Sequence, residues 1–249
     1  MTTTANHPSK VALVTGASRG IGAAVARRLA SDGFSVVVNY ASSSNEADAL
    51  VAELKAAGAQ AIAVKADVAK ADEVRRMFEI TEQQLGKLDV LVNNAGVLKT
   101  VPLADTSDAL FDQTLNINLR GTFNTLREAA ARLNDGGRIV NFSSTTLALN
   151  MPGYAVYNAT KAAVEAFTHV FAKELRGRNI TVNAVAPGPI ATSLFLNGKT
   201  EEQIQTFAKM PPLQRLGQPD DIASVVSFLA GPDSGWVNGQ ILRANGGVA

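Results

Sequence analysis

A tyrosine and a lysine in this sequence are spaced for proton transfer. Tyr157 and Lys161 are four residues apart in a long helical stretch, so their side chains lie on one face of a helix. A neighbouring ammonium group favours the phenolate, and we expect it to lower the pKa of the phenol from its usual value of roughly 10. Such a phenol can protonate a carbonyl oxygen while hydride reaches the carbonyl carbon. Because this spacing is also common on solvated helix surfaces, the pair needs support from other residues.

Polar residues that could serve the same reaction follow two predicted strands. Ser143 and Ser144 come directly after one strand, and Ser144 is thirteen residues before Tyr157. The segment 93–96, Asn-Asn-Ala-Gly, ends another strand. Ligands of open α/β sheets bind at the carboxyl ends of strands, where a serine hydroxyl can hydrogen-bond a carbonyl oxygen. Both segments are also ordinary turn sequences.

A glycine-rich turn joins the first predicted strand to the first predicted helix. Residues 15–22 read Thr-Gly-Ala-Ser-Arg-Gly-Ile-Gly and contain Gly16, Gly20 and Gly22. Glycine lets the chain turn sharply and approach a pyrophosphate closely, and the free N–H groups of the following helix face the anion. The turn therefore predicts a dinucleotide site, although glycine caps alone could explain it.

The end of the second predicted strand bears on the choice of dinucleotide. Enzymes that use NAD usually place an acid there to bind the ribose diol. Here residues 39–43 read Asn-Tyr-Ala-Ser-Ser, and the first acid is Glu46. Arg19 in the glycine-rich turn and the serine hydroxyls can bind a 2′-phosphate that no carboxylate repels. The sequence favours NADPH, with a simple polar turn as the alternative.

Two competing motifs can be set aside. Residues 16–20 match the G-x-S-x-G elbow of α/β-hydrolases. A hydrolase needs a later histidine beside that serine, and the only downstream histidine, His169, lies within a predicted helix. Residues 198–200, Gly-Lys-Thr, lack the glycine that a phosphate loop has five residues earlier, because Ser193 stands there.

Short apolar runs alternate with longer helical stretches along the chain. The apolar runs predict strands at 10–15, 34–39, 60–65, 88–92, 138–142, 180–184 and 240–243. Helical periodicity predicts helices at 21–31, 44–57, 70–85, 107–133, 154–176 and 220–229. Continuously apolar strands are typical of parallel sheets covered by helices on both faces. We predict an α/β fold with one doubly wound, Rossmann-type parallel sheet of about seven strands, because the glycine-rich turn argues against a (β/α)₈ barrel.

The domain organisation is predicted to be simple. The chain shows no repeat or break in composition, so we expect one domain at 10–249 after a flexible tail at 1–9. The stretch 187–219 is rich in proline and glycine, yet it contains apolar residues. Long irregular segments of compact domains usually serve function, so 188–218 is predicted to be a lid over the substrate.

Composition narrows the classes of function. The 249 residues include no cysteine and only two histidines, which excludes disulfides, thiolate metal sites, iron–sulfur clusters and a histidine-rich metal site. The formal net charge of +1 gives no reason to expect nucleic acid as a partner. The sequence shows no apolar run of membrane-spanning length and no signal peptide, so we expect a cytoplasmic protein without a membrane partner.

The ordered set of motifs resembles the short-chain dehydrogenase/reductase family over nearly the whole chain. The set comprises TGASRGIG, NNAG, Asn118, Ser144, the run Tyr-Asn-Ala-Thr-Lys at 157–161, and the Pro-Gly pair at 187–188. Each motif is weak alone, but the set in this order is specific. The resemblance implies an NADP(H)-dependent oxidoreductase that acts on ketones and secondary alcohols.

The resemblance also implies a role for each matching residue. Tyr157 would be the general acid, or the base in the reverse direction. Lys161 would hold the nicotinamide ribose and lower the pKa of the tyrosine. Ser144 would polarise the carbonyl, and Asn118 would anchor a water relay that resupplies the proton. The dinucleotide would be bound by Gly16, Ser18, Arg19, Gly20, Ile21 and Gly22 at the turn, Asn39, Tyr40, Ala41, Ser42 and Ser43 after the second strand, Asp67 and Val68 beside the adenine, Asn94, Ala95 and Gly96 along its middle, Tyr157 and Lys161 at the ribose, and Pro187, Gly188, Ile190 and Thr192 by the nicotinamide.

The expected substrate pocket is mostly apolar and lacks an acid. Its members are Val97, Leu98, Ser144, Thr145, Leu147, Met151, Tyr154, Leu194 and Phe195. This lining favours reversible reduction of a hydrophobic ketone to a secondary alcohol. The alternative is a 3-oxoacyl-acyl-carrier-protein reductase of fatty acid synthesis, which the chain also resembles. For that alternative, Asp135 would repel an acidic carrier, whereas Arg178 matches a family position for carrier contact.

Two further expectations concern assembly and rival classes. The resemblance implies a homotetramer in which the long helices and the C-terminal strand region pack between subunits. A nucleotide-binding regulator is the rival from another class. The intact set of Tyr157, Lys161, Ser144 and Asn118 argues against it, because a regulator has no need of these groups.

Overall fold

Seven parallel strands form one sheet in the computed structural model, which describes residues 9–249. The strands are β1 (Val11–Val14), β2 (Ser35–Tyr40), β3 (Ala61–Lys65), β4 (Leu88–Asn93), β5 (Arg138–Phe142), β6 (Thr181–Pro187) and β7 (Ile241–Ala244). Their order across the sheet is β3-β2-β1-β4-β5-β6-β7. The predicted doubly wound, Rossmann-type α/β fold is therefore confirmed.

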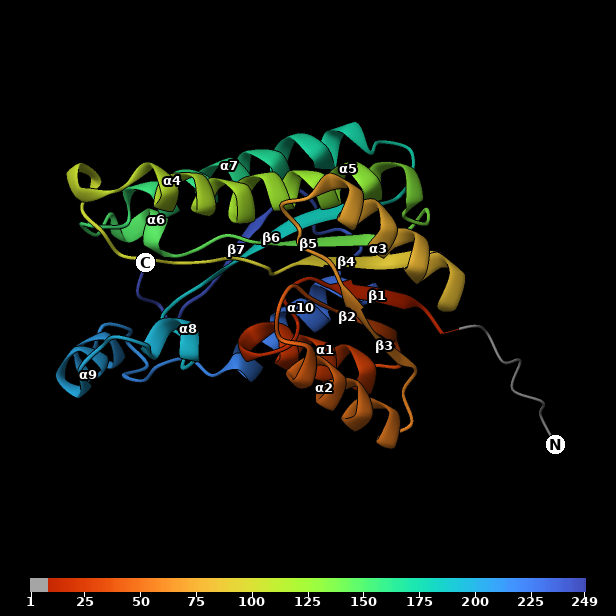
Figure 1. Ribbon diagram of the computed structural model, residues 1–249, viewed down its shortest axis with the longest axis horizontal. Coiled ribbons are helices and arrows are strands. Elements are labelled where there is room, and N and C mark those ends of the chain that lie inside the picture. The colour runs from red at the N-terminus through yellow and green to blue at the C-terminus, as the bar shows by residue number, and fades with distance from the viewer. Residues whose placement is uncertain (1–8) are drawn as a thin grey trace.

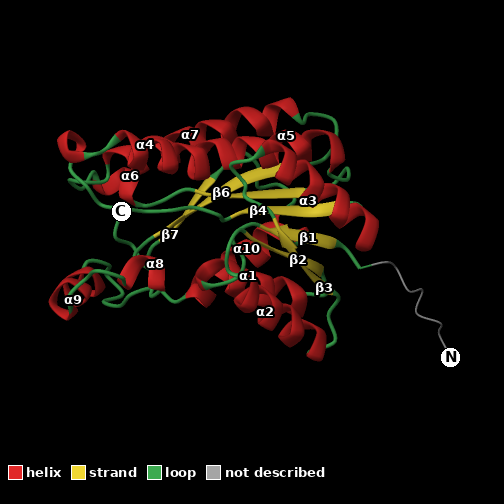
Figure 2. Ribbon diagram, in the orientation of Figure 1, coloured by secondary structure: helices red, strands yellow, loops and turns green. Residues whose placement is uncertain are grey.

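Helices cover both faces of the sheet (Figures 1 and 2). One layer contains α1 (Gly20–Ser31), α2 (Ser44–Ala56) and α10 (Pro219–Ala230). The other contains α3 (Ala71–Gln84), α4 (Asp108–Thr114), α5 (Gly121–Arg132) and α7 (Ala155–Glu174). Shorter helices are α6 (Thr146–Leu149), α8 (Ser193–Leu196) and α9 (Glu201–Lys209). None of the helices described between residues 9 and 249 has both the length and the apolar character that crossing a bilayer requires.

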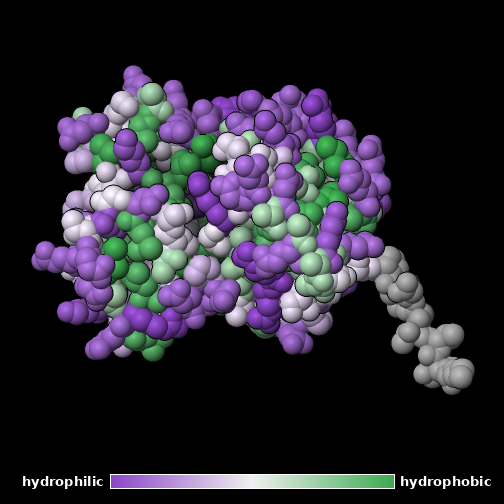
Figure 3. Space-filling model, turned by 60° about the horizontal axis from the view of Figure 1, so that its bottom comes forward, coloured by the Kyte–Doolittle hydropathy of each residue, from purple (hydrophilic) through white to green (hydrophobic). Residues whose placement is uncertain are grey.

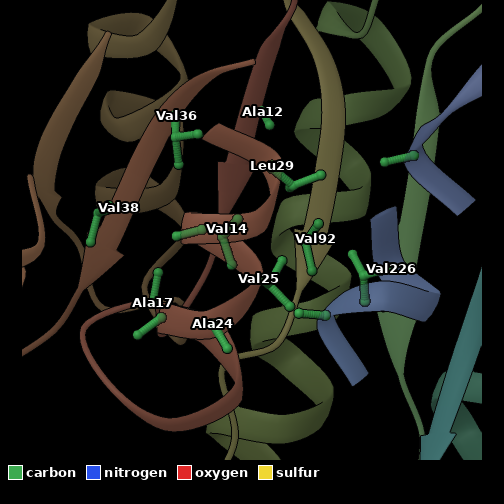
Figure 4. Packing of buried hydrophobic residues seen from close by; sticks show 14 of the residues in the cluster. Ala12, Val14, Ala17, Ala24, Val25, Leu29, Val36, Val38, Val92 and Val226 are labelled. Carbon is green, nitrogen blue, oxygen red and sulfur yellow. The ribbon is translucent and has the colours of Figure 1, made fainter. Parts of the chain in front are cut away.

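Strand β1 shows why the apolar runs are continuous. Ala12 and Val14 pack into the core beneath α1, α2 and α10, which Figure 4 shows from close by. Val11 and Leu13 point to the opposite face and join the core beneath α3, α5 and α7. Successive side chains of a strand alternate between faces, so a strand covered on both sides must be apolar at every position.

The order of the strands creates a crevice between β1 and β4. After β3 the chain returns to the centre of the sheet and continues outward on the other side. Ligands of open α/β sheets bind at such a reversal, beyond the carboxyl ends of the strands. The glycine-rich turn after β1 and the segment 94–96 after β4 both lie at this point.

The predicted helix 107–133 is interrupted in the structure. Between α4 and α5, the segment Leu115–Arg120 forms a wider π-helical turn. This turn contains Asn118, whose side chain is buried and bonds the backbone of Val97. Such π-turns inside α-helices often mark functional sites, and periodicity alone does not reveal them.

The structure adds local detail to the regions predicted as a lid and as a tail. The region 188–218 holds the two short helices α8 and α9 instead of one long irregular loop. Thr200 and Gln203 form a reciprocal capping box at the start of α9. Of the tail at 1–9, residues 1–8 lie outside the described residues, and the Ser9 hydroxyl is hydrogen-bonded to Ser35.

A ladder of buried polar side chains connects the two central strands to the helices above them. The Asn93 amide donates to Asn141 Oδ1 at 2.9 Å, and the Asn141 amide donates to Thr168 Oγ1 at 2.9 Å. Thr125 on α5 donates to Asn93 Oδ1 at 2.7 Å. All four side chains are buried, so each hydrogen bond also prevents a costly unpaired group.

We expect Asn141→Ala to lower the free energy of unfolding by about 2 kcal/mol, because it leaves the Asn93 amide without its acceptor in the core. The measurement is urea denaturation followed by circular dichroism. Asn45→Ala, at an exposed position of α2, serves as the matched control and should change stability by less than about 0.5 kcal/mol. Equal stability of the two variants would contradict a structural role for the ladder.

Candidate active site

The glycine-rich turn folds tightly between β1 and α1. Gly16 and Gly20 have φ angles of 61° and 58°, which lie in the left-handed region that favours glycine. A Cβ atom on Gly22 would come within 2.5 Å of both Asn94 Nδ2 and the Gly16 carbonyl oxygen. Gly22 therefore lies behind the turn, where it lets Asn94 hold the backbone by donating to the carbonyls of Thr15 and Gly16.

The start of α1 suits a phosphate group. Among the described residues, no side chain caps this helix at Arg19. The first N–H groups of a helix have no intrahelical acceptor and carry the positive end of the helix dipole. A groove of about 320 Å³ opens beside them. The turn, the uncapped helix and the groove together fit the pyrophosphate of a dinucleotide.

Most residues that were predicted to bind the dinucleotide lie along this groove. They are Gly16, Ser18, Arg19, Gly20, Ile21, Asn39, Tyr40, Ala41, Ser42, Ser43, Asp67, Val68, Asn94, Ala95, Gly96 and Thr192. The predicted Pro187, Gly188 and Ile190 line the adjoining pocket instead, together with Tyr157 and Lys161. Sequence reasoning missed Ala66, Ile117 and Ser193, which reach the groove from a loop, the π-turn and α8.

Asn39 shapes the groove rather than offering its side chain to a ligand. Its amide donates to the carbonyl oxygens of Val64 and Ala66, and its Oδ1 accepts a hydrogen bond from the Gly16 N–H. The side chain is 1% exposed. Arg19 and Ser42, in contrast, are exposed at the rim of the groove, where they can meet a 2′-phosphate.

Tyr157, Lys161 and Ser144 meet at the wall of one pocket, as the sequence predicts. The Lys161 ammonium is buried, donates to the Phe142 carbonyl oxygen at 2.7 Å, and lies 5.6 Å from the centre of the Tyr157 ring. Tyr157 itself is partly exposed to the pocket. Ser144 comes from the turn after β5, and hydrogen bonding by its side chain acts to lower the pKa of the Tyr157 phenol.

The pKa values in this structure differ from the expectation that Lys161 lowers the pKa of Tyr157. Surrounding protein atoms raise the pKa of the Tyr157 phenol to about 12, because burial disfavours the phenolate. Burial also lowers the pKa of the Lys161 ammonium to about 8. The lysine bonds a carbonyl oxygen and faces the ring of the tyrosine, so its charge does not offset the burial of the phenol.

Asn118 holds the loop that separates the groove from the pocket. Its Oδ1 accepts from the Val97 N–H at 2.8 Å and its amide donates to the Val97 carbonyl at 3.0 Å. The same amide lies 3.3 Å from Thr160 Oγ1 on α7. A Cβ on Gly96 would come 3.3 Å from Asn118 Oδ1 and 3.8 Å from Lys161 Nζ, so the loop also packs against the lysine.

The pocket beside Tyr157 has a volume of about 150 Å³ and adjoins the groove. Eight of the nine predicted substrate residues line it, and Leu147 does not. The reason is the helical turn α6, in which Thr146 and Leu149 are three residues apart and share the face toward the pocket. Figure 3 shows one face of the whole molecule, and hydrophobic surface surrounds the hollow on its left side.

The region 188–218 contributes an aromatic cluster to the pocket. Phe195 and Phe207 pack edge to face with ring centres 5.2 Å apart, and both line the pocket. Lys199 lies over Phe195 at 4.4 Å from the ring centre and donates to the Phe195 carbonyl. Phe207, Met210 and the near-terminal Val248 were missed from the sequence, because no local motif marks residues that enter a pocket only through tertiary folding.

We expect the buried ammonium of Lys161 to make stability depend on pH. At pH 7 the folded protein bears the charge of Lys161 in its core. Above about pH 8 the lysine of the folded protein loses its proton, whereas in the unfolded chain it keeps the proton up to about pH 10.5. The free energy of unfolding should therefore rise by about 2 kcal/mol between pH 7 and pH 9.5 from this group. Urea denaturation of Lys161→Met should lack this rise, and identical pH dependence in both proteins would contradict it.

Comparison with known proteins supports the chemistry of this site. A family model described as "Enoyl-(Acyl carrier protein) reductase" matches residues 16–249. A short-chain type dehydrogenase/reductase of Picea abies is 44% identical, over 96% of this chain and 92% of that protein. A 3-oxoacyl-[acyl-carrier-protein] reductase of Staphylococcus epidermidis is 42% identical, over 96% of this chain and 99% of that protein.

Solved structures agree with the sequence relatives. The crystal structure of a short-chain dehydrogenase from Burkholderia cenocepacia in complex with NADP has a TM-score of 0.91 and 40% identity, and the match covers 96% of this chain and 97% of that one. Both the sequence match and the structural match span the sheet, the groove and the pocket. The protein belongs to the short-chain dehydrogenase/reductase family.

Proposed function

We propose that this NADP(H)-dependent oxidoreductase reduces the carbonyl group of hydrophobic ketones to secondary alcohols, and that the reaction is reversible. The observation that carries the proposal is that the pocket lined by Tyr157 shares part of its wall with the dinucleotide groove. The dinucleotide groove and the apolar pocket share Ile21, Asn94, Gly96 and Val97 in their walls. A carbonyl bound in the pocket can thus face both the nicotinamide and the phenol.

In this proposal each polar residue of the pocket acts on the carbonyl or on the proton. NADPH, when bound, supplies the hydride that adds to the carbonyl carbon. Tyr157 gives its proton to the carbonyl oxygen, and its high pKa in the free protein keeps the acid form present at neutral pH. Ser144 hydrogen-bonds the same oxygen. Lys161 places a positive charge near both the phenol and the ribose.

Asn118 acts as a positioning residue in this scheme. Its side chain is fully used by the Val97 backbone and by Thr160, so it fixes the loop between the nicotinamide site and the substrate. The water relay that family resemblance assigns to this position belongs to the proposal. Its purpose is to return a proton to Tyr157 from solvent after each turnover.

NADP(H) is the dinucleotide that the groove fits better. NADP is bound to the related Burkholderia cenocepacia protein. In this chain Arg19 and Ser42 are exposed at the rim of the groove. Residues 39–43, which span the end of β2 and the loop after it, include no acid. A guanidinium and hydroxyl groups bind a 2′-phosphate, whereas a carboxylate there would bind the ribose diol of NAD.

The lining of the pocket supports a hydrophobic substrate. Leu98, Leu149, Met151, Leu194, Phe195, Phe207 and Met210 contribute its apolar walls. We assign the region 188–218 the role of a lid, because α8 and α9 bring Leu194, Phe195 and Phe207 over the pocket. A substrate with apolar groups on both sides of the carbonyl gains most from such walls.

The geometry of Arg178 argues against an acyl carrier protein as the partner. Its guanidinium donates to Asp135 Oδ1 at 2.7 Å, to the Ala130 carbonyl at 2.6 Å, and to the Leu133 carbonyl. The arginine is thus bound to the end of α5 and to the loop that follows α5, and its charge is paired with an acid. An acidic carrier would meet Asp135 beside it, so the free-ketone function is the better supported of the two.

A homotetramer also belongs to the proposal. Phe111, Phe123 and Val170 are exposed on α4, α5 and α7, which lie together in one layer (Figure 1). Trp236 is fully exposed near the C-terminal strand, and Phe228 on α10 is partly exposed. Exposed apolar groups of this size favour contacts between subunits. The assembly is expected in the cytoplasm.

We expect Tyr157→Phe to lower kcat for ketone reduction by about 10²- to 10⁴-fold, because the carbonyl oxygen loses its proton donor. The measurement is NADPH oxidation with a panel of hydrophobic ketones, with chiral analysis of the products. NADPH should still bind, with a loss of affinity far smaller than the loss of kcat. Full turnover in this variant would refute the assigned mechanism. For the wild-type protein, turnover only with carrier-bound thioesters would favour the alternative function, the reduction of 3-oxoacyl groups on an acyl carrier protein. NADPH binding without any turnover would indicate a nucleotide-binding regulator.

We expect Arg19→Ala to raise the Kd of NADPH by about 10- to 100-fold, the value of one charge-assisted hydrogen bond, with little change for NADH. Isothermal titration calorimetry with both dinucleotides measures this. Arg28→Ala is the matched control, since Arg28 lies on the same helix and pairs with Asp32 at 3.0 Å. Equal losses for the two dinucleotides in Arg19→Ala would refute recognition of the 2′-phosphate.

A further inference from the structure

A single lysine contacts both short helices of the lid. The ammonium of Lys199 donates to the Phe195 carbonyl oxygen of α8 at 2.5 Å. It lies 4.4 Å from the centre of the Phe195 ring and 6.0 Å from the centre of the Phe207 ring, which belongs to α9. Lys199 is part of the Gly-Lys-Thr run at 198–200, which is not a phosphate loop and has no part in the mechanism above.

Both kinds of partner suit a positive charge. The last carbonyl groups of a helix have no intrahelical donor, and a lysine near the end of the helix can supply one. The face of an aromatic ring carries negative potential, so a cation above it is attracted. Burial lowers the pKa of the Lys199 ammonium, because protein atoms cover part of the charge. A partly covered cation is attracted to a ring more strongly than a fully solvated one.

The backbone around Lys199 holds it at the junction of the two helices. Its N–H donates to the Leu196 carbonyl at 3.1 Å, and the next residue, Thr200, begins α9 with its capping box. Gly198 has a φ of 77°, a left-handed conformation that lets the chain turn between the helices. Helices of four and nine residues are too short to be stable alone, so contacts between them must hold α8 and α9 in place.

Lys199 lies outside the substrate pocket, whereas its aromatic partners form part of the pocket wall. Phe195 and Phe207 line the pocket, and Lys199 does not. The two rings pack edge to face with their centres 5.2 Å apart. Because the ammonium lies over one face of Phe195, this ring meets the pocket through its other face or its edge. The lysine can therefore act on a bound substrate only through the rings.

We propose that Lys199 is a positioning residue that connects α8 to α9 and thereby fixes the aromatic wall against which bulky ketones bind. The inference rests on the proposed function for its substrate, but the connection between the helices belongs to the folded protein itself. A ketone with a bulky apolar group gains affinity by burying that group against Phe195 and Phe207. A small ketone offers these rings little apolar area. Lys199 therefore acts on the choice between large and small ketones and not on the transfer of hydride or proton.

The first test requires no turnover and measures amide hydrogen exchange by mass spectrometry. We expect residues 193–209 to exchange about 3- to 10-fold faster in Lys199→Met than in the wild-type protein, because methionine keeps the length of the side chain but loses the charge and the donor. Lys199→Arg keeps a cation that can lie over the rings, so it should exchange at the wild-type rate. Equal exchange in Lys199→Met and the wild-type protein would overturn the proposal.

The second test separates KM from kcat at saturating NADPH, with acetophenone as the bulky ketone and 2-butanone as the small one. We expect Lys199→Met to raise KM for acetophenone by about 3- to 10-fold, the value of one partly covered cation–π contact, with kcat unchanged. KM for 2-butanone should stay the same, and Lys199→Arg should keep both wild-type values. An equal rise of KM for the two ketones, or a fall in kcat with KM unchanged, would overturn the proposal.

Lys209→Met is the matched control, because Lys209 is exposed in the last turn of α9 and also belongs to the lid. It should change neither the exchange of residues 193–209 nor KM for acetophenone. If Lys209→Met had the same effects as Lys199→Met, the loss of a charge anywhere on the lid would explain them, and the proposal would be overturned. Wild-type protein that binds NADPH but reduces no ketone would instead refute the proposed function, and the exchange test would still decide whether Lys199 connects the two helices.

Discussion

The burial of one ammonium group organises this site. Lys161 lies in the core between α7 and the end of β5, where water cannot solvate its charge, and the Phe142 carbonyl is its hydrogen-bond partner. Such a charge is costly in the folded protein and needs oriented dipoles around it. The long helix α7 sets the lysine and the phenol on one face, and β5 supplies the carbonyl. The pocket, the groove and the loop held by Asn118 are arranged around this pair.

A feature of the molecule could be predicted from the sequence where a pattern of neighbouring residues indicates it, and could not be predicted where it depends on tertiary contacts. The continuous apolar strands and the glycine-rich turn gave the sheet, its parallel direction and the position of the crevice. The π-turn at 115–120 could not be found, because apolar periodicity does not reveal it and its residue Asn118 bonds Val97, which is distant in the sequence. The same holds for α6, a single turn whose sequence also suits a loop.

The candidate site shows the same division. Residues fixed by a motif, such as Tyr157, Ser144 and Gly16, lie where the motif predicts. Leu147 does not line the pocket, because the direction of a side chain in a short helix depends on rotation about the helix axis. The pKa of Tyr157 also differs from the expectation, since spacing along a helix says nothing of what surrounds the phenol. Burial, which is a property of the folded chain, outweighs the neighbouring charge.

Thr192 connects the two halves of the site. Its methyl group lies beside Gly20 of the glycine-rich turn, and its hydroxyl accepts from the Phe195 N–H at the start of α8. The residue lines both the groove and the pocket. The chain segment that adjoins the start of α1 therefore continues directly into the apolar wall of the pocket, so a substitution at Thr192 alters the surroundings of both cavities at once.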